Sequence, residues 1–235
     1  MREIFARRVI AALLLLLPLG ACGIEQWDGS MRSLVSAPPP AAGLVDRSPE
    51  TIYAAGVAAL REQRYAQAVE LFEMLERDHP FSTWATNAKV LAAYGEYMRN
   101  RYTEAIGQLD RFIQLHPAHR DIAYAYYLRA LAHYEQISDS QRDQRQTELA
   151  LLALQEVVSR FPDTAYARDA RLKIDLARDH LAGREMNVGR FYLRQNLLNA
   201  AIGRFRRVVE EYQTTNHVPE ALHRLTEIYL ALGLR

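Results

Sequence analysis

The chain has 235 residues, of which 49% are hydrophobic and 24% charged, and its formal net charge is +1. This composition is typical of a globular protein with enough apolar side chains for a core, and the balanced charge gives no support to nucleic-acid binding. The chain contains a single cysteine, which excludes a disulfide within the chain.

Residues 1–21 have the pattern of a signal peptide, in which basic residues precede an apolar run, Val9–Leu19. The run is too short to span a bilayer comfortably. It ends in Leu19-Gly20-Ala21-Cys22, which resembles a bacterial lipobox, and we therefore expect Cys22 to be lipidated at the mature N-terminus. The alternative is an ordinary signal peptide in which the cysteine is incidental.

Residues 22–47 are predicted to form a flexible, lipidated tether. They are rich in Gly, Ser and Pro, including Pro38-Pro39-Pro40, and they show no helical periodicity. The residue after the cysteine is Gly23 rather than Asp, which by analogy with other lipoproteins favours sorting to the outer membrane. Trp27 is interpreted as an exposed tether residue, with an anchor at the membrane interface as the alternative.

The stretch Ser48–Pro80 is predicted to form two antiparallel helices joined by a short turn. Ser48 is a favourable N-cap, and Pro49 stands where the first helical turn tolerates a missing N–H. Small residues in both helices would let the two backbones approach closely. The positions that follow the spacing of the 34-residue tetratricopeptide repeat are Gly56, Tyr65, Ala68, Phe72 and Pro80.

This pattern recurs three times downstream, at intervals of roughly 37 to 51 residues. The matching residues are Ala93, Tyr102, Ala105, Leu109, Phe112 and Pro117 in the second copy, Ala130, Ala150, Leu154 and Pro162 in the third, and Gly189, Ala201 and Phe205 in the fourth. Four copies in register predict an all-α fold, a right-handed solenoid of about five repeats and about nine helices, with the last repeat incomplete. We expect repeats 1–2 in residues 48–117, repeat 3 in 118–164 and repeats 4–5 in 165–235.

Two connecting segments have unusual composition. The link between the first two repeats is aromatic, and we expect Phe81 and Trp84 to wedge between those repeats. Residues 138–146 form a polar insertion within repeat 3. Insertions in repeat proteins map to loops, so this one is predicted to be a solvated loop.

The C-terminal part of the chain leaves two questions open. A capped helical pattern begins after Thr164 and continues to about residue 195, and it is interpreted as one long helix or as two. Its glycines predict a bend near Gly183. A last helix is predicted from Pro219 to about Leu232 without a partner helix after it, so its apolar face either packs back or contacts another protein.

The sequence contains no recognisable catalytic or cofactor-binding motif. Its seven histidines lack metal-ligand spacing, and it has neither a phosphate-binding glycine loop nor a Gly-x-Ser-x-Gly nucleophile turn. Carboxylates are spread along the predicted helix surfaces, as on a solvated face. We therefore expect no enzyme activity, no cofactor and no bound metal.

Tyrosines are concentrated where the first helix of each repeat faces the concave side of the solenoid. Tyrosine offers a large rigid ring with a polar tip at low entropic cost, which suits a peptide-binding groove. Packing between neighbouring repeats is an equally good interpretation. The six candidates are Tyr53, Tyr94, Tyr97, Tyr124, Tyr127 and Tyr134.

A resemblance to a known family rests on specific segments spread over nearly all of residues 22–232. These are Pro49–Ala54, His79–Phe81, Ala92–Tyr94, Asp110–Pro117, Tyr127–Leu131 and Arg160–Thr164. Asp110–Pro117 is more specific than the generic repeat pattern. Together with the lipobox and the Pro-rich tether, these segments resemble the BamD (YfiO/ComL) family, lipoproteins of the outer-membrane β-barrel assembly (BAM) machine.

The resemblance implies a non-catalytic scaffold, anchored by its lipid to the periplasmic face of the outer membrane. The family's N-terminal repeats are implicated in receiving the aromatic-ending C-terminal signal of unfolded outer-membrane proteins. Its C-terminal repeats hold the last POTRA domain of BamA, alongside other BAM lipoproteins. Arg204 corresponds to a basic residue of the BamA contact, whereas the neighbouring Arg206 and Arg207 illustrate the alternative of a solvated arginine.

The chain departs from the family pattern in two respects, a short insertion in repeat 3 and an end after the first helix of the fifth unit. Contacts made by a terminal helix in the family are therefore not carried over. The alternative function is that of another tetratricopeptide lipoprotein, such as a pilus-secretin pilot or a peptidoglycan-linked coordinator. A lipid-anchored enzyme is the third class considered.

Overall fold

The computed structural model describes residues 48–137 and 144–233. Within these ranges the chain is all helical, as predicted. The helices are α2 (Pro49–Arg61), α3 (Tyr65–Asp78), α4 (Thr83–Met98), α5 (Tyr102–Leu115), α6 (Ile122–Tyr134), α7 (Gln144–Arg160), α8 (Ala165–Arg194), α9 (Leu198–Glu211) and α10 (Val218–Ala231). The predicted signal peptide, the tether with Cys22 and most of the repeat-3 insertion lie outside the described residues. None of the described helices has the length and apolar character needed to cross a membrane.

Side-chain caps fix the starts of several helices. The Ser48 hydroxyl accepts a hydrogen bond from the Thr51 backbone N–H, and Pro49 begins α2. Ser82 caps α4, and Thr164 caps α8 in the same manner. These caps satisfy backbone donors that the first turn of a helix leaves unpaired.

Three helix pairs are closed by the same kind of tight turn. A residue with positive φ follows α2, α4 and α8, namely Gln63 at 59°, Asn100 at 59° and Asn196 at 57°. In the first turn the Arg64 N–H donates to the Ala59 carbonyl at 2.8 Å. This bond belongs to the Schellman motif, in which a left-handed residue ends a helix and reverses the chain.

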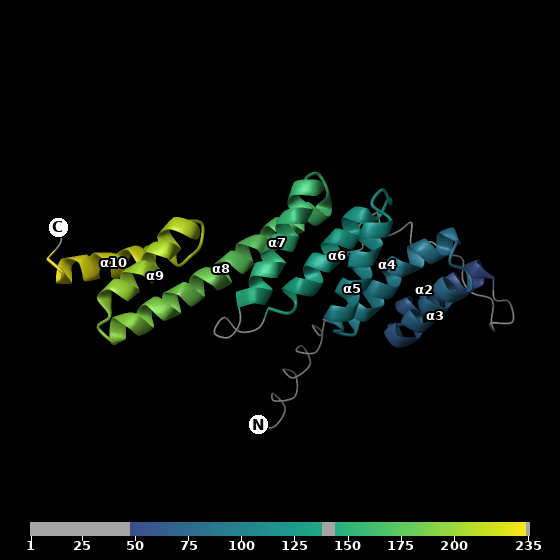
Figure 1. Cartoon of the computed structure of the whole chain (residues 1–235), viewed down its shortest axis with the longest axis horizontal. Coiled ribbons are helices and arrows are strands. Elements are labelled where there is room, and N and C mark those ends of the chain that lie inside the picture. Colours follow the sequence, from purple (N-terminus) through teal and green to yellow (C-terminus); the bar gives the residue numbers. More distant parts are fainter. Residues whose placement is uncertain (1–47, 138–143, 234–235) are drawn as a thin grey trace, which may run out of the picture.

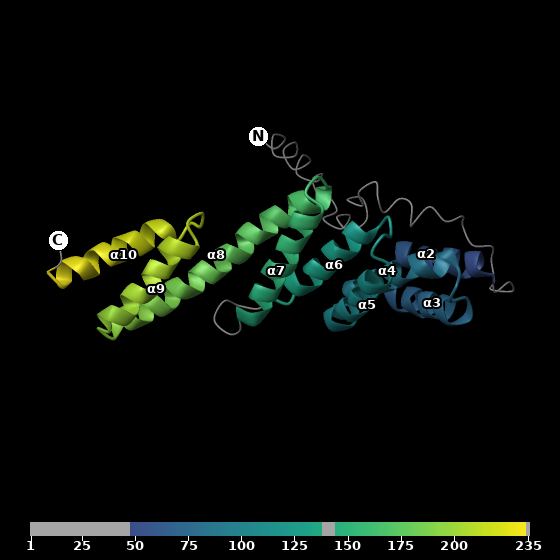
Figure 2. The same cartoon turned by 45° about the horizontal axis from the view of Figure 1, so that its top comes forward.

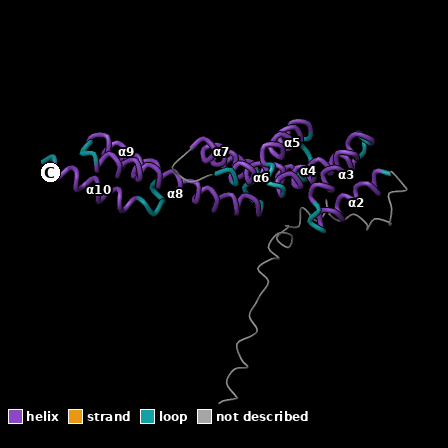
Figure 3. Tube along the Cα trace, turned by 90° about the horizontal axis from the view of Figure 1, so that it is seen from below, coloured by secondary structure: helices purple, strands orange, loops and turns teal. Residues whose placement is uncertain are grey.

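The helices form a row of antiparallel pairs that follow one another in chain order (Figure 1). α2 packs with α3, α4 with α5, α6 with α7 and α8 with α9, while α10 packs on α9. The first helices of successive pairs also touch, α2 with α4, α4 with α6 and α6 with α8. The molecule is elongated in all three views, with α2 and α10 toward opposite ends (Figure 2, Figure 3).

α8 is one continuous helix of 30 residues, and it shows no bend in Figure 1 or Figure 2, so the predicted bend near Gly183 is wrong. Figure 1 and Figure 2 show it running without a break between the two halves of the molecule. Its glycines serve close packing instead. A Cβ at Gly189 would lie 2.5 Å from a ring carbon of Phe205, and one at Gly183 would lie 3.1 Å from His217 Nε2.

The buried residues form two hydrophobic cores, and α8 contributes to both. The N-terminal core extends from Ile52 in α2 to Ile174 in the first half of α8. The C-terminal core consists of Ala182, Met186, Ala201, Phe205, Val208, Ala221, Leu225 and Ile228. Both cores contain a close contact between a glycine of the first helix of a pair and a phenylalanine of the second. A Cβ at Gly56 would lie 2.4 Å from a Phe72 ring carbon, just as a Cβ at Gly189 would lie too close to Phe205.

The aromatic link between α3 and α4 behaves differently from the prediction at one of its two positions. The Trp84 ring packs 4.8 Å from the Tyr53 ring, and its Nε1–H donates to Glu50 at 3.0 Å, so it does join two repeats. Phe81 is fully exposed, and its predicted wedge is wrong. Phe81 lies in the turn before the Ser82 cap and is therefore not on the periodic apolar face of either helix.

Candidate partner-binding surfaces

The tyrosines expected in a concave groove divide into buried and partly exposed sets. Tyr53 is 1% exposed, Tyr94 is 6% exposed and Tyr124 is 8% exposed. Tyr53 packs against Phe72, with 5.9 Å between the ring centroids. These three tyrosines are core residues, so their assignment to a groove is corrected. The physical reason is contact with neighbouring helices, because Tyr53 packs against both Phe72 of α3 and Trp84 of α4, and the Tyr124 ring lies 5.6 Å from the Tyr166 ring of α8.

The other three tyrosines lie on α4 and α6 and remain partly exposed. The Tyr97 hydroxyl donates to Glu135 at 3.4 Å, and the Tyr127 hydroxyl donates to Asp169 of α8. The Lys173 ammonium lies 5.7 Å above the Tyr134 ring. These contacts hold the rings across three neighbouring first helices.

The electrostatics of this face keep Tyr97 and Tyr127 protonated. Burial raises the pKa of Tyr97, and the Glu135 carboxylate adds to the rise. Burial also raises the pKa of Tyr127, reinforced by its hydrogen bond to Asp169. The hydroxyls therefore act as donors, and the face combines aromatic area with fixed carboxylates. Such a surface can contact the apolar side chains of a peptide and can accept its N–H groups.

Arg204 lies on α9, and its side chain is 39% exposed. Its Nη1 lies 3.0 Å from Oε2 of Glu185, a side chain of α8 that is only 4% exposed. Arg207 also reaches Glu185, at 3.3 Å, and pairs with Glu211 at 2.9 Å. Arg204 is therefore anchored at one side and exposed at the other, unlike a freely solvated arginine.

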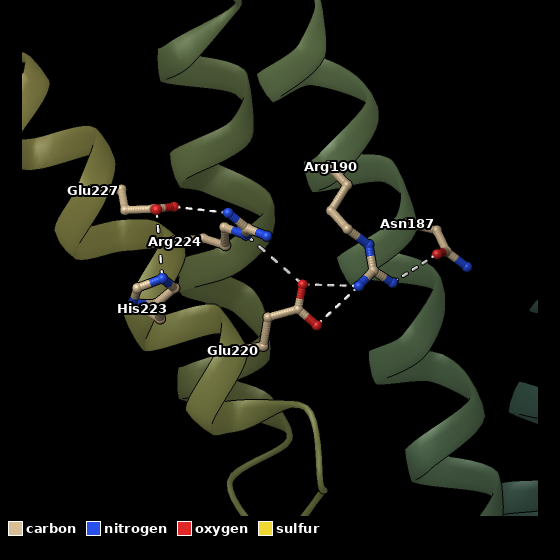
Figure 4. Close-up of polar contacts among 6 residues, drawn as sticks. All are labelled: Asn187, Arg190, Glu220, His223, Arg224 and Glu227. Carbon is tan, nitrogen blue, oxygen red and sulfur yellow. Dashed lines mark hydrogen bonds and ion pairs between the residues drawn. The ribbon is translucent and has the colours of Figure 1, made fainter.

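A second polar cluster joins α8 to α10 (Figure 4). The Arg190 guanidinium donates to both carboxylate oxygens of Glu220, each at 2.9 Å, and to Asn187 at 2.9 Å. Glu220 also lies 3.8 Å from Arg224, which donates to Glu227 at 2.9 Å. The cluster fixes α10 against α8.

The structure shows what covers the apolar face of α10, for which the sequence predicted no following partner helix. Leu225 and Ile228 are buried in the C-terminal core, so most of this face packs back on the preceding helices. Leu222 remains about half exposed.

Neither Glu185 nor the pair of Arg190 with Glu220 was predicted from the sequence. The spacing of Glu220 and Arg224, four residues apart on one helix, indicates an ion pair between those two residues, but it does not indicate that Arg190 also binds Glu220. Nothing in the sequence indicated that Glu185 would pair with α9. Among the residues that the structure describes, no group of three or more His, Cys, Asp or Glu side chains is placed to hold a metal ion.

Comparison with known proteins gives a consistent result. The family described as "YfiO: Outer membrane lipoprotein" matches residues 45–235. The outer membrane protein assembly factor BamD of Caulobacter vibrioides is 50% identical over 189 residues, which cover 80% of this chain and 62% of that protein. The BamD of Rickettsia prowazekii is 47% identical over 184 residues, 78% of this chain and 73% of that protein. The BamD of Neisseria meningitidis serogroup A is 34% identical over 198 residues, 80% and 74% of the two chains.

The chain thus spans less than two thirds of the length of the Caulobacter relative. Among solved structures, a thermophilic TPR protein of Thermus thermophilus has a TM-score of 0.43 at 17% identity, covering 78% of this chain and all of that one.

Proposed function

Because this chain belongs to the YfiO family of outer membrane lipoproteins, we propose that it is a scaffold of the BAM complex and assists the assembly of β-barrel outer-membrane proteins. The observation that carries this proposal is the 50% identity to an assembly factor over 189 residues, which cover 80% of this chain. The protein acts by binding, and lipidation at Cys22 would hold it on the periplasmic face of the outer membrane.

The pair formed by α8 and α9 is the proposed surface for a BamA-like POTRA domain. Arg204 supports this, because it offers a partly exposed guanidinium on a helix that is fixed to the rest of the fold. Arginine is suited to such contacts because its planar fork donates several hydrogen bonds at once. Other BAM lipoproteins are proposed as further partners.

The face with Tyr97, Tyr127 and Tyr134 is the proposed contact for unfolded outer-membrane protein segments. Exposed ring area and fixed acceptors at Glu135 and Asp169 support binding of an aromatic-ending peptide. The burial of the other three tyrosines narrows this face to α4, α6 and the adjoining part of α8.

The decisive experiment is a pull-down from detergent-solubilised envelopes with the C-terminally tagged chain. We expect the wild type to recover a BamA-like barrel protein and Arg204→Glu to lose it. Arg206→Glu is the matched control, since Arg206 lies on the same helix and is 57% exposed.

Each other result has a distinct meaning. Recovery of the barrel protein by both the wild type and Arg204→Glu would remove Arg204 from the contact but keep the BAM assignment. Recovery of a secretin instead would identify a pilot lipoprotein and reject the proposal.

A further inference from the structure

We infer that Glu185 is a positioning residue that orients Arg204 for the partner contact, an inference that rests on the proposed function. Glu185 lies on α8, the helix shared by the two cores, while Arg204 lies on α9. The Glu185 carboxylate is nearly inaccessible to solvent and therefore cannot itself be the main partner contact.

The hydrogen bonds leave one edge of Arg204 open. A guanidinium has five N–H donors, and its Nε and Nη2 together form a fork that matches two acceptor oxygens. Both bonds from Arg204 to Glu185 come from Nη1, at 3.0 Å to Oε2 and 3.4 Å to Oε1. Within the described part of the chain, Nε and Nη2 of Arg204 have no hydrogen-bond partner. The fork therefore remains available.

The two neighbouring arginines differ in this respect. Arg207 uses Nε for Glu211 at 2.9 Å and Nη1 for Glu185 at 3.3 Å. Arg206 uses Nη2 for the Tyr229 hydroxyl at 3.0 Å, and its Nε lies 3.9 Å from Glu210. Of the three arginines on α9, Arg204 alone combines a buried anchor with an open fork, as far as the described residues show.

Anchoring lowers the cost of using Arg204 in an interface. An arginine that moves freely in solvent loses rotamer freedom when a partner immobilises it, and this loss opposes binding. Glu185 has already ordered the Arg204 side chain in the free protein. Arg207 supports the arrangement from the other side, because it holds the same carboxylate and is tied to Glu211.

A double-mutant cycle on partner affinity tests the inference. The full-length chain in detergent is titrated with a purified BamA-like POTRA domain, using the wild type, Glu185→Gln, Arg204→Ala and the double variant. We expect Glu185→Gln to weaken binding about three- to tenfold, as the loss of one pre-ordered side chain predicts. Arg204→Ala should weaken it more, and the double variant should bind like Arg204→Ala.

The readout separates positioning from general stability. If Glu185→Gln acted only by loosening α8 from α9, its effect would persist in the Arg204→Ala background, and the inference would be overturned. Unchanged or tighter binding by Glu185→Gln would overturn it as well. Glu210→Gln, which alters the ion pair of Arg206, is the matched control and should bind normally.

Two further results keep the test decisive. Arg204→Lys retains the charge but lacks the fork, and it lies on the surface, so it will fold even where Glu185→Gln does not. Binding of Arg204→Lys at wild-type strength would reject the fork geometry. If Arg204→Ala binds the POTRA domain as strongly as the wild type does, the proposed site on α9 fails together with the role of Glu185. Membership of the complex would still stand.

Discussion

The N-terminal and C-terminal cores use the same helix-pair contact but differ greatly in size. Among the described residues, 30 buried hydrophobic residues form the N-terminal core and eight form the C-terminal core. The smaller core is supplemented by polar contacts between its helices, including Arg204 with Glu185 and Arg190 with Glu220.

This difference has a physical consequence. Stability from apolar burial scales with the area removed from water, so the C-terminal core has less to lose before its helices separate. Ion pairs that are partly exposed contribute little and are weakened by salt. We therefore expect α9 and α10 to open more easily than the N-terminal repeats. α8 connects the two parts, because it contributes to both cores.

The largest test of this difference truncates the phenylalanine that meets the helical glycine in each core. Phe205→Ala and Phe72→Ala each remove a fully buried ring, a change that costs about 3–5 kcal/mol. We expect Phe205→Ala to expose α9 and α10 to hydrogen exchange nearly completely, because so small a core does not tolerate the loss. Phe72→Ala should lower protection in α2 and α3 but leave them folded. Equal responses of the two regions, measured by exchange mass spectrometry, would contradict the proposed inequality.

A smaller effect is expected from the polar contact that fixes α10. Glu220→Gln removes the charge that Arg190 binds, and since both side chains are about one third exposed, the loss should stay below about 1 kcal/mol. Hydrogen exchange in α10 should rise at low salt, and the difference from the wild type should shrink in high salt. Glu76→Gln, which removes the partner of Lys89 beside the larger core, is the control and should not increase exchange in α3.

The smallest expected effect is a pH dependence confined to the N-terminal region. Burial lowers the pKa of His119, an effect that the Asp121 carboxylate partly offsets, and burial also lowers the pKa values of His116 and His133. In the neutral form, His119 Nδ1 accepts the Asp121 N–H at 3.1 Å, and Nε2 lies 3.1 Å from Asn87 Oδ1.

The sign follows from proton binding. The unfolded chain binds protons at these histidines more readily than the folded chain, so the associated stability is present above the ordinary histidine pKa of 6.5 and is lost as pH falls through the lowered folded pKa values. The melting temperature of the N-terminal region should therefore fall between pH 7.5 and 5.5, and His119→Gln should reduce that slope. A steeper slope in the C-terminal region would contradict this assignment.

The candidate sites show where sequence reasoning reached its limit. Three of six tyrosines proposed for the concave face are in the core, because residues spaced along one helix face point inward or outward according to the neighbouring helices. Arg204 was identified by resemblance, but its anchor Glu185 was not, since the two are 19 positions apart and belong to different helices. Tetratricopeptide spacing alone does not specify such pairs.

The sequence by itself determined the local elements of this protein. Capping residues and apolar periodicity act within one or two helical turns, so the caps at Ser48 and Thr164 followed from the sequence pattern alone. Only the tertiary structure decided that α8 is unbroken, that the core is divided and that Glu185 holds Arg204. These features depend on which helices meet across space, and packing between helices, rather than the preference of a glycine, sets the outcome.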